Sequence, residues 1–200
     1  MLIFGGASTD LDGPTSDLWS YTPSTSLWSL LKPLGSVVPS PREMHSSTSQ
    51  PIATDYGFCF YVYGGRDIDG RVLSDLYRLD VRADAGTWRY DWVSLASGPS
   101  PRCSAGALSV IETASSGRET KLVLFGGFDG AALSDECLVY DVGKDVWKAE
   151  RIGGGTARPC GRMAHATTTG CEGGGGGGKL IVVGGVAMEG DFADVYEIGC

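Results

Sequence analysis

Four short apolar runs in this chain each end in a pair of glycines, and the pairs recur at a spacing of about 60 residues. The pairs are Gly5-Gly6, Gly64-Gly65, Gly126-Gly127 and Gly184-Gly185. Self-similarity at one fixed period indicates supersecondary units that stack in order, rather than one irregular domain.

The rest of each unit also repeats. An acidic, glycine-bearing loop follows each glycine pair, and a second short run rich in aromatic and β-branched residues then predicts a strand. A tryptophan with apolar followers comes next, and an arginine turn opens the following unit. The second runs start near Asp17, Asp75, Glu136 and Asp194, the tryptophans are Trp28, Trp92 and Trp147, and the turn arginines are Arg42, Arg102 and Arg162. This order predicts four strands in each period.

The order of these elements resembles the kelch repeat, and the resemblance covers essentially the whole chain. It implies an all-β fold, a kelch-type β-propeller in which each repeat forms one twisted four-stranded blade. Single units depart from the pattern: Ala105 stands where His45 and His165 stand in other units, and Cys160-Gly161 precede Arg162 where proline is expected.

In this frame about 14 strands are expected, which make about 3.5 blades, two complete and two partial. The expected boundaries within one repeat region, 1–200, are a partial blade at 1–38, complete blades at 39–98 and 99–157, and a partial blade at 158–200. Because unpaired strand edges invite association, we expect the chain to be a fragment of a propeller of about six or seven blades, or to pair with another chain through open strand edges.

The aromatic residues of the repeated runs are expected to fill the wedges between blades rather than to stack on a ligand, because each buries a large apolar area. They are Trp19, Trp28, Trp92, Trp147, Tyr21, Tyr77, Tyr140 and Tyr196.

The net charge of −8 opposes binding to nucleic acid or anionic membranes, which needs concentrated lysine and arginine. No stretch is long and apolar enough to insert in a bilayer, and no charged-then-apolar leader precedes the first run. A cytoplasmic location is the resulting expectation. The six cysteines show no Cys-x-x-Cys spacing, so we expect free thiols and no zinc site.

Two further motifs invite sharper interpretations. The segments 10–13 and 67–70 resemble the start of a calcium loop, but neither has the acidic closing ligand, and aspartate and glycine are ordinary turn residues. The glycine run 173–178 before Lys179 resembles a phosphate loop, but Leu180 stands where serine or threonine would bind magnesium. We therefore expect no metal site and no cofactor.

The acidic loops and the arginine turns are expected on one propeller face, which would carry mixed charge. Arg42, Arg102 and Arg162 either pair locally or hold a peptide carboxylate. Arg66 is the stronger candidate for partner contact because it alone among the arginines directly follows a glycine pair. The remaining candidates on this face are Arg71, Asp67 and Asp129. His45 and His165 are interpreted as hydrogen-bonded structural residues, with metal binding as the alternative.

Two classes of function remain open. The first is a protein-interaction module or scaffold that presents the loops of this face to a protein or peptide. The second is an enzyme, because galactose-oxidase-type propellers share this repeat style, with catalytic residues in further blades. The sequence contains no recognisable catalytic set, so the interaction module is preferred.

Overall fold

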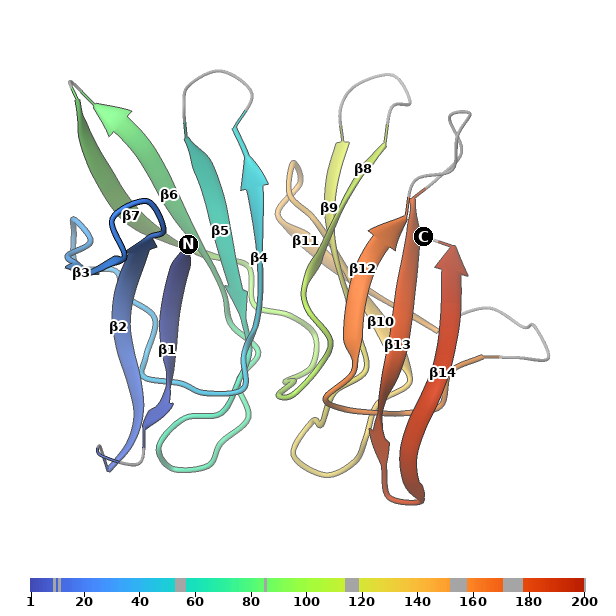
Figure 1. The fold of residues 1–200 in the computed structure, drawn as a ribbon. Coiled ribbons are helices and arrows are strands. Elements are labelled where there is room, and N and C mark those ends of the chain that lie inside the picture. The colour runs from blue at the N-terminus through green and yellow to red at the C-terminus, as the bar shows by residue number, and fades with distance from the viewer. Residues whose placement is uncertain are drawn as a thin grey trace.

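The computed structural model describes residues 1–8, 10, 12–52, 57–84, 86–113, 119–151, 158–170 and 178–199. The regular elements of these residues are β-strands, arranged in four separate antiparallel sheets that follow one another in chain order (Figure 1).

The first sheet contains β1 (Leu2–Ser8), β2 (Gly13–Thr22) and β3 (Leu27–Leu31). The second contains β4 (Ser46–Pro51), β5 (Phe58–Tyr63), β6 (Leu76–Asp84) and β7 (Thr87–Leu95). The third contains β8 (Ser109–Thr113), β9 (Glu119–Phe125), β10 (Glu136–Asp141) and β11 (Val146–Arg151). The fourth contains β12 (Ala166–Gly170), β13 (Lys179–Ala187) and β14 (Gly190–Gly199). Two four-stranded and two three-stranded sheets confirm the predicted all-β architecture and the predicted blade count.

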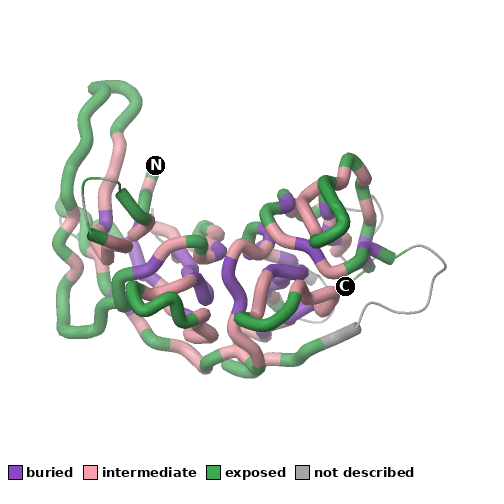
Figure 2. The backbone as a smooth tube through the Cα atoms, turned by 90° about the horizontal axis from the view of Figure 1, so that it is seen from below, coloured by how far each residue is buried: buried purple, intermediate pink, exposed green. Residues whose placement is uncertain are grey.

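The sheets pack face to face, and an apolar core fills each of the three junctions. Figure 2 shows buried residues toward the middle of the molecule and exposed residues on its outer loops. Phe4 and Leu18 of the first sheet meet Val62 and Trp92 of the second. The other two cores repeat this arrangement one and two sheets further along the chain. The first strands β4, β8 and β12 lie next to one another across the sheets, as strands near a common axis must. Burial between blades, rather than within one blade, therefore holds the structure together.

Most of the aromatic residues lie in these cores, as expected. Tyr77, Trp92, Tyr140, Trp147 and Tyr196 belong to the clusters between sheets. The prediction was wrong for Trp28, whose surface is 49% exposed. With Ile3 and Trp19 it lines a shallow depression on the first sheet. The physical reason is that no described sheet packs against this face.

Both ends of every sheet have a defined character. The hairpins β2–β3, β6–β7 and β10–β11 lie at the upper end in Figure 1, whereas the loops after the glycine pairs and the connections between sheets lie at the lower end. We call this lower end the loop face. It is the face on which the sequence placed its candidate contact residues.

Candidate functional site

A recurring backbone contact joins each sheet to the next on the loop face. The N–H groups of Gly6, Gly65 and Gly127 donate hydrogen bonds of 2.8 Å each to arginine carbonyl oxygens of the following unit. The accepting residues are Arg42, Arg102 and Arg162. A Cβ on the first glycine of each pair would lie only 2.3–2.8 Å from the same carbonyl oxygen. The glycine pairs are therefore required by close backbone approach.

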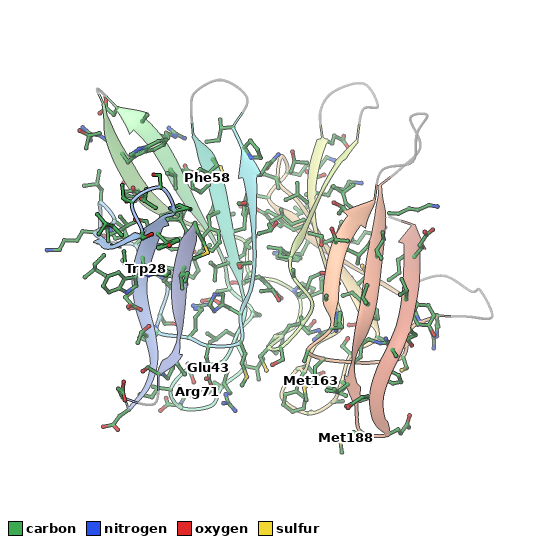
Figure 3. All side chains as sticks on the ribbon, in the orientation of Figure 1. Trp28, Glu43, Phe58, Arg71, Met163 and Met188 are labelled. Atoms are coloured by element: carbon green, nitrogen blue, oxygen red, sulfur yellow. The ribbon has the colours of Figure 1, made fainter. Side chains whose placement is uncertain are left out.

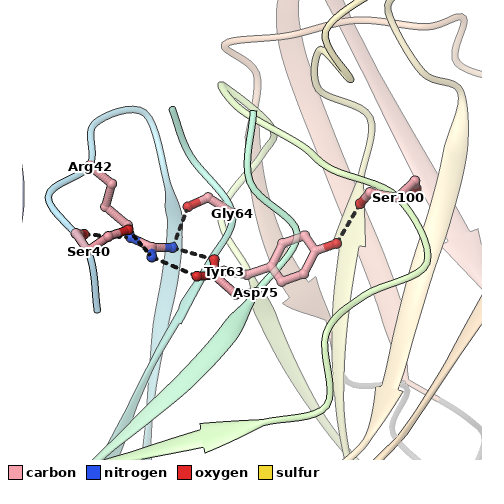
Figure 4. Close-up of polar contacts among 6 residues, drawn as sticks. All are labelled: Ser40, Arg42, Tyr63, Gly64, Asp75 and Ser100. Carbon is pink, nitrogen blue, oxygen red and sulfur yellow. Dashed lines mark hydrogen bonds and ion pairs between the residues drawn. The ribbon is translucent and has the colours of Figure 1, made fainter. Parts of the chain in front are cut away.

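The arginine side chains then turn back into their own unit. Arg42 donates to both carboxylate oxygens of Asp75, at 2.6 and 2.8 Å, and to the carbonyl oxygen of Gly64 at 2.9 Å (Figure 4). Arg162 binds Asp194 and the carbonyl oxygen of Gly184 in the same way. These bidentate ion pairs fix the arginine turn against Asp75 next to β6 and against Asp194 within β14.

Arg102 makes the corresponding contact with a different pair of acceptors. Its Nη2 donates to Ser134 Oγ at 2.8 Å and to Glu136 Oε2 at 3.0 Å. The three arginines are 0–3% exposed. Of the two roles that the sequence left open for them, this geometry favours local pairing over contact with a partner.

The two histidines also lie inside the repeat scaffold. His45 packs edge-on against Phe4, and His165 packs edge-on against Phe125. The Nε2 atom of His165 lies 3.1 Å from the backbone nitrogen of Gly106 and 3.0 Å from the carbonyl oxygen of Phe125. Burial lowers the pKa of each histidine to about 4, and the neighbouring arginine charge adds to the effect. Both rings are therefore neutral near pH 7.

Three equivalent turns lie along the loop face. In each turn, one residue forms an isolated antiparallel β-bridge with a residue that follows the glycine pair. The bridges join Glu43 to Arg66, Cys103 to Phe128 and Met163 to Val186. The next residue in each turn, Met44, Ser104 or Ala164, has a positive φ of 49–56°. The backbone of the three turns is thus the same, while their side chains change from an ion pair to apolar contacts.

These turns border a groove of about 780 Å³ that runs across the second, third and fourth units. We call it the turn groove, and its apolar lining consists mainly of Met44, Cys103, Phe128, Leu133, Met163 and Met188. Met163 and Met188 project at the lower end of the fourth sheet (Figure 3). Met188 is 94% exposed and Met44 is 47% exposed. Apolar side chains that line a groove at this exposure indicate a contact surface.

Arg66 lies at one end of the turn groove and is bound to Glu43. Its Nη2 donates to Glu43 Oε1 at 2.5 Å and its Nε to the same oxygen at 3.0 Å. Arg71 is paired with Asp69 at 3.1 Å, and both side chains are exposed. The exposed side chains of Arg66 and Arg71 thus each have a carboxylate partner.

The loops carry charges of both signs, with acidic side chains in excess. Among the described residues, the predicted acidic positions are Asp10, Asp12, Asp67, Asp69, Asp129, Glu189 and Asp191, and the loop after Gly126-Gly127 adds Asp135, which pairs with Arg158. These carboxylates outnumber the arginines Arg66 and Arg71 of the same loops. The balance is more negative than the sequence suggests, because Arg42, Arg102 and Arg162 are buried and paired with carboxylates. The loop face is consequently acidic.

The loop aspartates stabilise their own turns. Asp67 Oδ1 accepts hydrogen bonds from the backbone N–H groups of Asp69 and Arg71. Asp129 Oδ1 accepts from the N–H groups of Ala131 and Ala132, and these bonds lower the pKa of its carboxyl group. The turn interpretation of the segment 67–70 agrees with this geometry. Leu11 and residues 173–177 of the other two motifs lie outside the described residues.

The structure brings four of the predicted contact residues, Arg66, Arg71, Asp67 and Asp129, to the loop face. Sequence reasoning missed the apolar members of the turn groove. The signal was present in the sequence as Cys103 and Met163, which replace Glu43 at equivalent positions, and as Phe128, which replaces Arg66. Apolar residues at exposed turn positions are the pattern that would have identified the groove.

The described residues contain no group of three or more His, Cys, Asp or Glu side chains placed to hold a metal ion. Cys59, Cys103 and Cys160 are free thiols, while Cys171 and Cys200 lie outside the described residues. No described segment forms a helix with the length and hydrophobicity that crossing a membrane requires.

Comparison with known proteins gives one family match that spans the repeat region. The family model of the KLHDC2/KLHL20/DRC7 Kelch-repeats domain matches residues 1–199. Human host cell factor 1 is 28% identical over 180 residues, and the match covers 84% of this chain and 8% of that protein. Acyl-CoA-binding domain-containing protein 4 of Arabidopsis thaliana is 30% identical over 170 residues, with coverage of 84% and 22%. This chain therefore corresponds to a small part of these relatives.

Two solved structures share the architecture. The structure of YjhT superposes with a TM-score of 0.58 at 15% identity, over 94% of this chain and 48% of that one. A chain of the RAG complex with one melted and one unmelted RSS superposes with a TM-score of 0.67 at 16% identity, over 91% and 54%. At these identities the likeness shows the fold alone.

Proposed function

Because this chain belongs to the kelch-repeat family, we propose that it is a protein-interaction module that binds a protein or peptide partner through its loop face. The whole protein's partners are part of this proposal, since the chain spans only 8% of host cell factor 1. The turn groove supports binding, because exposed apolar side chains that line a groove indicate a contact surface.

One observation carries the proposal: the scaffold of the three turns repeats, but the side chains they display do not. Each turn has the same arginine anchor, the same bridge and the same positive φ at one position. The displayed pairs are Glu43 with Arg66, Cys103 with Phe128 and Met163 with Val186. Variable side chains on a rigid, repeated framework are typical of recognition loops.

The predicted contact residues fit this surface in different ways. Arg66 lines the turn groove, while Arg71, Asp67 and Asp129 stand on loops around it. Arg42, Arg102 and Arg162 would act indirectly, because their ion pairs hold the turns in place. We therefore propose direct contact for the first four residues and a positioning role for the other three.

The test is affinity capture of protein partners by the full chain, with variants that change only exposed residues. Met44→Asp with Met188→Asp places charge on the turn groove, and Leu27→Asp with Val146→Asp makes the same change on exposed residues at the opposite end. We expect recovery of the partner to fall about tenfold or more with the groove variant, and to stay unchanged with the control.

The same capture gives the result that would overturn the proposal. If partners are recovered equally with the groove variant, or are lost only with the opposite-end variant, the loop face is not the binding surface. Circular dichroism of both variants checks that neither change unfolds the chain.

A further inference from the structure

We infer that the turn groove takes an extended, basic segment of a partner protein, with lysine or arginine side chains alternating with apolar ones. This inference rests on the proposed function and adds the chemistry of the partner. Two properties of the groove carry it: an apolar floor and an acidic surround.

The apolar floor requires apolar side chains in the ligand. Cys103 is buried, Phe128 and Met163 are half-buried, and Met44 and Met188 stand exposed at the sides. Burial of a leucine or methionine side chain of the ligand on this floor would remove apolar surface of both partners from water. Unbranched methionine side chains adapt to different apolar shapes, so the floor does not demand one particular residue.

The dimensions of the groove suit an extended ligand of several residues better than a single side chain. The lining comes from turns of three successive units and encloses about 780 Å³. This is the volume range of clefts that hold several chemical groups at once. An extended peptide places alternate side chains on opposite sides, so that one set can face the floor and the other the surround.

The acidic surround selects the sign of the ligand's charge. Glu189 lines the groove and is exposed, and Asp191 follows it on the same hairpin. Asp129 stands on the loop that supplies the Ala131 and Ala132 part of the lining. Carboxylates around an apolar groove attract lysine and arginine and speed their approach.

The basic side chains near the groove do not cancel its acidic character, because each is paired with a carboxylate. Arg66 is bound to Glu43, and Arg71 is bound to Asp69. Arg158 lies beside the groove residue Cys160 in the sequence and is paired with Asp135 at 3.5 Å. An acidic ligand would have to compete with these carboxylates for the arginines, whereas a basic ligand can approach Glu189 and Asp191 on the other side of the groove.

The experiment measures fluorescence anisotropy of labelled nine-residue peptides titrated with the full chain. The first peptide alternates lysine and leucine, the second has glutamate in place of every lysine, and the third has serine in place of every leucine. We expect the lysine–leucine peptide to bind about tenfold or more tightly than either of the others. Its affinity should fall as salt is raised, because exposed charges are screened.

Two single substitutions locate the binding. Glu189→Lys should weaken binding of the lysine–leucine peptide about three- to tenfold and reduce its salt dependence. Met188→Ser should weaken it at all salt concentrations. Glu119→Lys is the matched control, since Glu119 is exposed at the opposite end of the third sheet. The control should leave the affinity unchanged.

Equal or tighter binding of the glutamate–leucine peptide would overturn the inference, as would equal effects of Glu189→Lys and Glu119→Lys. The failure of this inference is distinct from failure of the proposed function. If groove variants lose captured partners but the basic peptide does not bind, the loop face is a binding surface for another chemistry. If the peptide binds and no captured partner depends on the face, the proposed function fails.

Discussion

Some single glycines are required where two units approach closely, because a side chain there would collide with the next unit. Gly64 has a φ of +63°, and a Cβ there would lie 2.3 Å from the carbonyl oxygen of Arg102. Gly70 has a φ of +79°, but a Cβ there would have no heavy atom within 4 Å. Alanine would be strained at both positions because of the positive φ, but it would collide with a neighbouring atom only at Gly64.

We predict that Gly64→Ala lowers the free energy of unfolding by about 3 kcal/mol or more, from strain and collision together. Gly70→Ala should cost only about 1 kcal/mol, because strain acts alone. Urea unfolding followed by tryptophan fluorescence measures both. Equal costs would show that the contact with Arg102 does not hold the junction.

His165 makes stability depend on pH at the level of one side chain. Its folded-state pKa of about 4 lies below the ordinary value of 6.5, because it is buried and close to Arg162. The neutral ring therefore stabilises the fold fully above pH 6.5, and this contribution is lost as pH falls from 6.5 through 4.

The prediction is a loss of about 2 kcal/mol from this residue between pH 7.5 and pH 5. His165→Gln should reduce the pH dependence of the unfolding free energy by about this amount, whatever its effect on stability at pH 7.5. Urea titrations of both proteins at the two pH values provide the measurement. An unchanged pH dependence would mean that His165 takes up a proton equally in the folded chain.

Strands with equivalent sequences contribute differently to the free energy of unfolding, because different elements pack against them. Trp92 on β7 is 5% exposed and meets the ring of Phe4 from the neighbouring sheet at 5.0 Å. Trp28 occupies the equivalent place on β3, stacks on Tyr21 at 4.8 Å and is 49% exposed. Of these two tryptophans, only Trp92 packs in a junction between sheets.

We expect Trp92→Ala to cost about 3–5 kcal/mol in the free energy of unfolding, as removal of a buried tryptophan does. Trp28→Ala should cost about 1 kcal/mol, the value of an exposed aromatic pair. Trp92→Phe should be milder than Trp92→Ala, because Trp92 Nε1 has no hydrogen-bond partner in the described structure that the change could remove. Thermal unfolding of the three variants ranks them.

The strands and their order were predictable because they recur, and recurrence separates the common scaffold from local variation. The exposure of Trp28 was not predictable, since the sequence of β3 resembles that of β7 and only the absence of a described neighbouring sheet distinguishes them.

The turn groove was also missed. Its members come from three units and are separated by up to 145 positions between Met44 and Glu189, so no local pattern unites them.

At the scale of the whole molecule, the two end sheets each present half of a junction. Val183 and Val195 of the last sheet are 43% and 63% exposed. Their equivalents in the other three sheets are 0–3% exposed: Phe4 and Leu18, Tyr63 and Leu76, and Phe125 and Cys137. On the first sheet Ile3 is 42% exposed, whereas its equivalents Val62, Leu124 and Val182 are 0–1% exposed.

These two exposed faces are complementary. In every described junction, the face of one sheet that carries Phe4 or its equivalent packs against the face of the next sheet that carries Val62 or its equivalent. We therefore predict that the 200-residue chain associates head to tail as its concentration rises. Val195→Asp should weaken this association about tenfold or more, because a charge would be buried in the junction. Sedimentation velocity over a range of concentrations measures it, with Met188→Asp on the loop face as the control that leaves association unchanged. If Val195→Asp and the control associate alike, the contact is made elsewhere, and a chain that stays monomeric throughout contradicts the prediction.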